Sequence, residues 1–182
     1  MTFDAYEAVV FDLDGTLVHL DVDWDAVDEA VREVLSEHGV ATATSTAWDL
    51  YDDAETVGRA DDVEAIIASH ERDGATRARR LPLADRLPVG VPTAVCSLNC
   101  EQAVRTALDD HGLATHVQVV VGRDTTGARK PDPRPLLAAI EGLGADPERT
   151  LFVGDSARDE ETARRAGVEF AYVVDLLEVD RA

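Results

Sequence analysis

The stretch AVVFDLDGT, residues 8–16, joins a short apolar run to a polar sequence that is typical of a turn. Its first half, AVVF, predicts a buried strand, because it is a short apolar run bounded by turn residues. Similar runs recur later as TAVCS (93–97), VQVVV (117–121), TLFVG (150–154) and FAYVV (170–174). Helix-like segments at 101–111, 133–142 and 157–166 separate these runs. The alternation predicts an α/β core, a three-layer Rossmann-like parallel sheet with helices on both faces.

A long acidic region with helical spacing separates the first predicted strand from the second. Its helical patterns cover, in order, residues 23–36, 45–57 and 61–72. In the first pattern, apolar residues recur at helical spacing, and aspartates at its start suit a helix N-cap. We therefore expect an α/β core of residues 1–17 and 89–182, with a small α-helical cap of residues 18–88 inserted in it.

The charge of the chain restricts the partners that it can bind. Lysine and arginine together number 17 and aspartate and glutamate 37, so the formal net charge is −20. This charge repels nucleic acid and anionic membranes, and we expect neither as a partner. It also resembles the surfaces of halophilic proteins, where salt screens the self-repulsion. The acidic residues scattered through 21–64 are then expected to lie on solvated faces.

Nothing in the sequence predicts a membrane segment. No apolar run approaches the roughly 18 residues that span a bilayer, and polar residues closely follow Met1. We therefore expect a cytoplasmic protein without a signal peptide, and a monomer is the default expectation. Cys96 and Cys100 predict small, partly buried thiols rather than a metal site, because neither a second pair nor a histidine lies near them.

Polar side chains follow the predicted strands, at the edge where open α/β sheets bind their ligands. They are Asp12 and Asp14 after the first strand, Ser97 and Asn99 after the second, Lys130 after the third, and Asp155, Ser156 and Asp159 after the fourth. Carboxylates gathered at one edge repel one another and require a hard cation such as Mg²⁺. With that cation, one carboxylate can attack phosphorus while another transfers protons. A lysine and a serine can hold the phosphoryl oxygens.

Lys130 is the only lysine of the chain. A single lysine is commonly a surface residue, but the rest of this chain uses arginine, and Lys130 lies among the polar strand ends. Its position therefore favours a function that needs a compact ammonium. Taken singly, Asp14 and Gly15 can form an ordinary turn, and Asp155 and Ser156 a helix N-cap. Only the residues taken together indicate catalysis.

The motifs FDLDGT, VCSLN, KPDP and GDSARDE occur in this order between residues 11 and 160. Together they resemble the four motifs of the haloacid dehalogenase-like (HAD) hydrolase superfamily, in particular its phosphoglycolate phosphatase-like branch, which has a helical cap after the first motif. The resemblance implies a Rossmann-like core and a Mg²⁺-dependent phosphatase. Its substrate would be a small phosphorylated metabolite, hydrolysed through an aspartyl-phosphate.

The resemblance also implies roles for individual residues. Asp12 would be the nucleophile and Asp14 the general acid/base, while Ser97 and Lys130 would complete the catalytic set by holding the phosphoryl group. The metal ligands would be Asp12, Asp14 through its backbone carbonyl, Asp155 and Asp159. The phosphate-binding candidates are Gly15, Thr16, Ser97, Asn99 and Lys130.

Two alternative functions are compatible with the same residues. A phosphomutase of the β-phosphoglucomutase kind would use the same core and return the phosphoryl group to a sugar. A catalytically silent binding or regulatory protein could share the fold, although it would not need Asp12, Asp14, Lys130 and Asp155 together.

Several residues of the predicted cap have two readings. A basic patch could attract an anionic substrate or pair with neighbouring acids. It consists of Arg72, Arg77, Arg79 and Arg80. His19 could face the site or serve a structural or surface role, and Trp24 and Trp48 are expected in the core of the cap.

Overall fold

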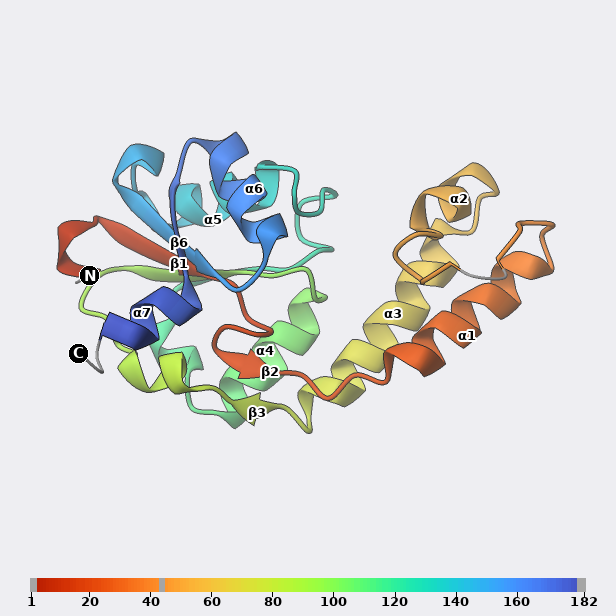
Figure 1. Ribbon diagram of the computed structural model, residues 1–182, viewed down its shortest axis with the longest axis horizontal. Coiled ribbons are helices and arrows are strands. Elements are labelled where there is room, and N and C mark those ends of the chain that lie inside the picture. Colours follow the sequence, from red (N-terminus) through yellow and green to blue (C-terminus); the bar gives the residue numbers. More distant parts are fainter. Residues whose placement is uncertain (1–2, 43–44, 180–182) are drawn as a thin grey trace.

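The computed structural model describes residues 3–42 and 45–179. Among them, five parallel strands form a central sheet in the order β5-β4-β1-β6-β7 (Figure 1). The strands are β1 (Ala8–Phe11), β4 (Thr93–Cys96), β5 (Val119–Val121), β6 (Thr150–Gly154) and β7 (Glu169–Tyr172). β1 lies at the centre, between β4 and β6, and is buried along its whole length, as its continuous apolar sequence predicts.

Helices cover both faces of the sheet, and alternate residues of β1 pack into opposite layers. The helices are α4 (Glu101–Asp110), α5 (Arg134–Leu143), α6 (Ala157–Ala166) and α7 (Val173–Val179). Val9 and Phe11 pack in one apolar cluster with α4 and α7, whereas Val10 packs in the other with α5 and α6. Figure 1 shows α5 and α6 above the sheet and α4 and α7 below it. The predicted three-layer α/β fold is confirmed.

The residues between β1 and β4 form a mainly helical insertion that extends away from the sheet (Figure 1). Its elements are β2 (Val18–His19), α1 (Trp24–Ser36), α2 (Tyr51–Thr56), α3 (Ala60–Ala75) and β3 (Arg79–Arg80). β2 pairs antiparallel with β3, so the two connections to the core run side by side. The helices bury an apolar cluster that includes Val31, Leu50 and Ile67. α3 also packs against α4, which brings the insertion into contact with the core.

Local sequence explains where several helices begin and end. The carboxylate of Asp23 accepts a hydrogen bond from Ala26 N and caps α1. Ser156 and Asp159 form a capping box at the start of α6, and Gly167 ends that helix in the left-handed conformation. Short 3-10 helices complete the chain: η1 (Phe3–Ala5), η2 (Pro82–Arg86), η3 (Ala114–His116) and η4 (Pro147–Arg149).

The structure differs from the sequence-based expectations in several places. The pattern expected as a helix at 45–57 is helical only over Tyr51–Thr56, and the strand expected at 117–121 is limited to Val119–Val121. The strand expected at 170–174 ends at Tyr172, and Val173 begins α7. The β2–β3 pair was not predicted, because strands of two residues carry no measurable periodicity. Leu83 and Leu87, near the end of the predicted cap, pack in the same cluster as Phe11. The division into core and cap at residues 17/18 and 88/89 stays a proposal.

Within the described ranges, no helix combines the length and the apolar character that crossing a membrane would require.

Candidate active site

The predicted polar residues meet at the carboxyl edge of the sheet. The strand ladders continue into the loops there, where Asp12 N donates to Val153 O at 2.8 Å and Ser97 N to Val121 O at 2.9 Å. A cavity of about 210 Å³ lies at this edge, and we call it the strand-end cleft. It is lined by Asp12, Asp14, Trp24, Trp48, Ser97, Leu98, Asn99, Lys130, Asp155, Ser156 and Arg158. Residues from widely separated parts of the sequence therefore share one cleft.

The ammonium of Lys130 joins two acidic motif residues beside this cleft. Its Nζ donates to Asp12 Oδ1 at 2.9 Å, to Asp159 Oδ1 at 2.5 Å and to the carbonyl oxygen of Cys96 at 3.2 Å. These acceptors use all of its N–H groups, and the side chain is only 2% exposed. Burial works to lower the pKa of Lys130, but the charges of Asp12 and Asp159 outweigh it and hold the pKa above its ordinary value. The buried ammonium is therefore charged.

The strand-end cleft holds more carboxylate than one ammonium can neutralise. Burial raises the pKa of Asp12 above its ordinary value although Lys130 lowers it, and the charge of Asp159 raises it further. Burial also raises the pKa of Asp14, whereas a backbone N–H that it accepts works against the shift. For Asp155, partial burial and then the charge of Asp159 raise the pKa. A surplus of negative charge on oxygen atoms favours a bound cation.

Asp12, Asp155 and Asp159 form a group that could hold that cation. Each offers a carboxylate oxygen, and these oxygens lie within 4.8 Å of one another. Hard oxygen ligands with surplus negative charge fit Mg²⁺ better than a softer metal. Asp14 is not part of this group, so its predicted contribution would come from its backbone carbonyl alone.

Asp159 has further contacts that its motif position does not reveal. Its Oδ1 accepts from Lys130, and its Oδ2 accepts from Ser156 N at 3.2 Å and from Ser156 Oγ at 2.6 Å. Its side chain is 1% exposed. Asp159 therefore orients Lys130 and caps α6 in addition to facing the carboxylate group.

Gly15 allows the first motif to approach Asp155 closely. Its φ of +82° lies in the left-handed region that favours glycine. A Cβ atom at this position would lie 2.1 Å from Asp155 Oδ2. A side chain here would displace that carboxylate, so the glycine keeps Asp155 in the group of carboxylates.

The structure does not bring Thr16 into the strand-end cleft. Its side chain is fully buried and lines a second cavity, of about 300 Å³, together with Gly15, Leu83 and Leu177. Within the described part of the chain, its hydroxyl has no hydrogen-bond partner. The placement of Thr16 does not support its predicted contact with phosphate.

Ser97 and Asn99 are both buried at one wall of the cleft. Ser97 Oγ donates to Asn99 Oδ1 at 3.0 Å and accepts from Asn99 N at 3.2 Å. The side-chain amide of Asn99 in turn donates to Glu71, a residue of α3. The loop after β4 thus holds the Ser97 hydroxyl in place, and it does so with help from the insertion.

Four further residues of the cleft were not predicted as site residues: Trp24, Trp48, Leu98 and Arg158. Trp24 and Trp48 pack against the apolar cluster of the insertion, as expected, but they also line the cleft with their ring centroids 5.9 Å apart. Arg158 is exposed, and no acidic residue of the described ranges forms an ion pair with it. An unpaired arginine at the cleft of an acidic chain favours an anionic ligand. Its sequence signal was a basic residue inside the acidic fourth motif.

The basic patch predicted in the cap lies outside the cleft. Arg77 pairs with Asp21 at 3.1 Å, and Arg80 pairs with Asp85 at 2.8 Å. For these two arginines the reading as partners of neighbouring acids is confirmed. Neither Arg72 nor Arg79 lines the cleft either.

A family model and curated relatives match this chain. Residues 87–173 match the family model described as haloacid dehalogenase-like hydrolase. A phosphoglycolate phosphatase from Rhodospirillum rubrum is 34% identical over 189 residues, covering 89% of this chain and 77% of that protein. An N-acetylmuramic acid 6-phosphate phosphatase from Pseudomonas aeruginosa is 31% identical over 186 residues, covering 92% of this chain and 81% of that protein.

Solved structures share the fold. A Lactobacillus plantarum protein with a provisional assignment as phosphoglycolate phosphatase superposes with a TM-score of 0.66 and 27% identity, covering 96% of this chain and 87% of that one. A HAD-superfamily hydrolase from Geobacter sulfurreducens superposes with a TM-score of 0.60, covering 95% and 97% of the two chains. At 22% identity, the second likeness concerns the fold alone.

Proposed function

The chain belongs to the haloacid dehalogenase-like hydrolase family, and on this premise we propose that it is a Mg²⁺-dependent phosphatase of small phosphorylated metabolites. The reaction proceeds in two steps through an aspartyl-phosphate on Asp12. The observation that carries the proposal is the buried contact of Lys130 with Asp12 and Asp159 at the edge of a cleft that also holds Asp14 and Asp155.

In the first step, a carboxylate oxygen of Asp12 attacks phosphorus and the bond from phosphorus to the ester oxygen breaks. Asp14 donates a proton to the leaving oxygen, a role that suits a carboxyl group whose pKa is raised by burial. Ser97 turns its hydroxyl from Asn99 to a phosphoryl oxygen. The ammonium of Lys130, whose N–H groups are already engaged, offsets the negative charge that the phosphoryl group brings.

In the second step, Asp14 removes a proton from water and the water oxygen attacks phosphorus. The bond from phosphorus to Asp12 breaks, which releases inorganic phosphate and regenerates the carboxylate. The insertion supplies Trp24 and Trp48 to the cleft wall, and these rings limit the access of bulk water to the acyl phosphate.

Mg²⁺ would be held by the carboxylates of Asp12 and Asp155, with Asp159 beside them and the backbone carbonyl of Asp14 as a further oxygen. When bound, it would neutralise the carboxylate surplus and allow an anionic phosphate to approach an anionic nucleophile.

The size and charge of the cleft favour a small substrate. Its volume of about 210 Å³ is below the roughly 300–1,000 Å³ of sites that bind drug-sized ligands, which favours a small substrate. Arg158 would bind a second anionic group of the substrate, such as a carboxylate. Phosphoglycolate, named in the relative from Rhodospirillum rubrum, is therefore the first ester to test.

A panel of phosphate esters, assayed with Mg²⁺ in high salt, tests the proposal. Asp12→Asn is expected to abolish release of phosphate, whereas Asp110→Asn, at an exposed aspartate outside the cleft, should leave it unchanged. Hydrolysis that persists in Asp12→Asn would sink the assignment of the nucleophile. Net release of phosphate also separates a phosphatase from the phosphomutase alternative, which no observation on the described residues favours.

A further inference from the structure

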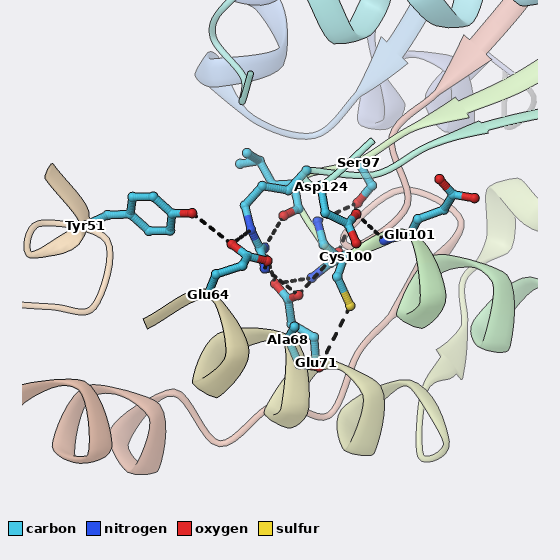
Figure 2. A network of polar contacts seen from close by, with 11 residues as sticks. Tyr51, Glu64, Ala68, Glu71, Ser97, Cys100, Glu101 and Asp124 are labelled. Atoms are coloured by element: carbon cyan, nitrogen blue, oxygen red, sulfur yellow. Dashed lines mark hydrogen bonds and ion pairs between the residues drawn. The ribbon is translucent and has the colours of Figure 1, made fainter. Parts of the chain in front are cut away.

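A buried ion-pair network lies beside the strand-end cleft and outside the proposed catalytic set. Glu71 of α3 is 0% exposed and Arg123, in the loop after β5, is 5% exposed. Figure 2 shows Glu64 and Glu71 reaching from α3 toward the loops that follow β4 and β5. Charged residues are rarely buried so deeply unless they are fully paired, so the network calls for a physical account.

Arg123 has every N–H donor of its guanidinium engaged. Nε and Nη2 donate to the two carboxylate oxygens of Glu64 at 2.9 and 2.7 Å. Nη1 and Nη2 donate to the two oxygens of Glu71 at 2.7 and 3.1 Å, and Nη1 also donates to the carbonyl oxygen of Leu98. Burial lowers the pKa of Arg123, but hydrogen bonds and charge from both glutamates outweigh it and raise the pKa above its ordinary value.

Glu71 connects this network to the wall of the cleft. Its Oε2 accepts from Cys100 N at 2.9 Å, and its Oε1 accepts from Asn99 Nδ2 at 3.3 Å. An ionised carboxylate can only accept, so Asn99 must present its NH₂ group to Glu71. The amide oxygen of Asn99 is then forced to face Ser97, whose hydroxyl donates to it at 3.0 Å. Glu71 therefore determines the orientation of one amide and, through it, the position of one hydroxyl.

The geometry of the core loops keeps Arg123 in this position. Gly122 passes so close to the start of α4 that a Cβ atom would lie 2.4 Å from Glu101 N. The next acidic residue, Asp124, accepts a hydrogen bond from that same Glu101 N at 2.8 Å. Arg123 N also donates to Asn99 O at 3.0 Å. The loops after β4 and β5 thus form one unit, onto which α3 docks through its glutamates.

Joining the insertion to the core would not by itself require this arrangement, because apolar residues of similar volume attach helices at least as well as buried ion pairs. An arrangement of charges does specify which way an amide points, which apolar contacts cannot do. Glu64 makes the same bidentate contact with Arg123 but has no contact with Asn99 or Cys100. Both glutamates therefore attach α3 to Arg123, but only Glu71 also fixes the orientation of Asn99.

We propose that Glu71 is a positioning residue, which acts through Asn99 to hold the one hydrogen of the Ser97 hydroxyl away from phosphate in the strand-end cleft. Phosphate binding then depends on the docking of α3 against the loop after β4. This inference rests on the proposed function, because it assumes that Ser97 contacts the phosphoryl group.

Glu71→Gln tests the inference, with Glu64→Gln as its matched control on the same helix and the same arginine. The amide that replaces the carboxylate keeps one oxygen, which accepts from the fixed Cys100 N, so its NH₂ group faces Asn99. Asn99 then turns over, and its own NH₂ group faces Ser97. Calorimetric titration with inorganic phosphate in the presence of Mg²⁺ is expected to show binding strengthened about tenfold, because the Ser97 hydroxyl can then donate to phosphate without giving up a hydrogen bond to Asn99. Glu64→Gln should bind phosphate like the wild type, whatever its effect on stability.

Coupling to Ser97 separates positioning from general damage. In a Ser97→Ala background, Glu71→Gln should change phosphate binding less than about twofold, because the hydroxyl that Glu71 restrains is gone. Weaker or unchanged phosphate binding in Glu71→Gln, an equal effect of Glu64→Gln, or full additivity with Ser97→Ala would overturn the inference. If Glu71→Gln fails to fold, Asn99→Ala carries the test, because it removes the acceptor of the Ser97 hydrogen, and phosphate binding that is not strengthened in it would be equally decisive against the inference.

The same titration distinguishes failure of the inference from failure of the proposed function. A wild type that binds phosphate but hydrolyses no ester contradicts the phosphatase and leaves the positioning role of Glu71 to be judged by its variants. A wild type that binds no phosphate overturns the positioning role as well.

Discussion

Replacement of Lys130 by methionine should destabilise the protein strongly and in a manner that depends on pH. Methionine is unbranched and of similar length, so it can occupy the same buried space. The change leaves Asp12 and Asp159, 7% and 1% exposed, without the ammonium that each contacts. Removal of one partner from a buried ion pair costs about 3–5 kcal/mol of unfolding free energy, and here two carboxylates lose the same partner.

The sign of the pH dependence follows from Asp12. Burial raises its pKa to about 7 in the folded protein, in spite of Lys130, whereas an aspartate in the unfolded chain titrates near 3.9. Between these values the folded protein binds more protons than the unfolded chain, so the unfolding free energy falls as the pH rises. Without the ammonium the pKa of Asp12 rises further, so the unfolding free energy keeps falling up to a higher pH. The deficit of Lys130→Met relative to wild type should therefore grow between about pH 5 and about pH 9.

Urea unfolding of the metal-free protein, at constant high salt and at both pH values, measures this deficit. Arg134→Met is the matched control, because it removes a cation from the exposed pair with Asp132. The control should shift the urea midpoint little, and equally at both pH values, since Asp132 is ionised throughout. The reasoning is refuted if Lys130→Met loses no more stability than the control, or loses the same amount at both pH values.

Two further substitutions test the shape and charge of the cleft. Gly15→Ala should lose Mg²⁺ affinity and activity, because the new Cβ would collide with Asp155. Gly90→Ala, at a similar φ of +84° but with nothing within 4 Å of the new Cβ, should lose only some stability. Equal Mg²⁺ affinities of the two variants in calorimetry would contradict the collision. Arg158→Gln should raise the KM for phosphoglycolate about tenfold and barely change the KM for a phosphate ester without a second charge. Equal effects on both esters would show that Arg158 does not bind a second anionic group.

Much of the site could be placed from the sequence. Asp12, Ser97 and Asp155 each directly follow a buried apolar strand, and parallel strands bring their carboxyl ends to one edge of the sheet. The strand β6 and the helix α6 have the bounds that their local patterns predict, because apolar runs, an N-cap serine and a terminal glycine are all local signals.

The contacts between these residues were less accessible to sequence reasoning. Lys130 was identified by being the only lysine, but its contact with Asp159 depends on how α6 packs against β6. Thr16 belongs to the same motif as Asp12, yet its side chain points to another cavity, because consecutive residues of a turn face different directions.

The sequence by itself determined the layers of this protein and the edge at which its chemistry gathers, because periodicity and strand ends are local properties that survive into the fold. Only the tertiary structure decided that Glu64, expected among the solvated acids, and Glu71 bind Arg123, which lies 52 residues beyond Glu71 in the chain. No periodic pattern marks such a pair. In a chain with so many acidic residues, each one is expected in water until packing brings a specific partner against it, and that packing depends on the whole fold.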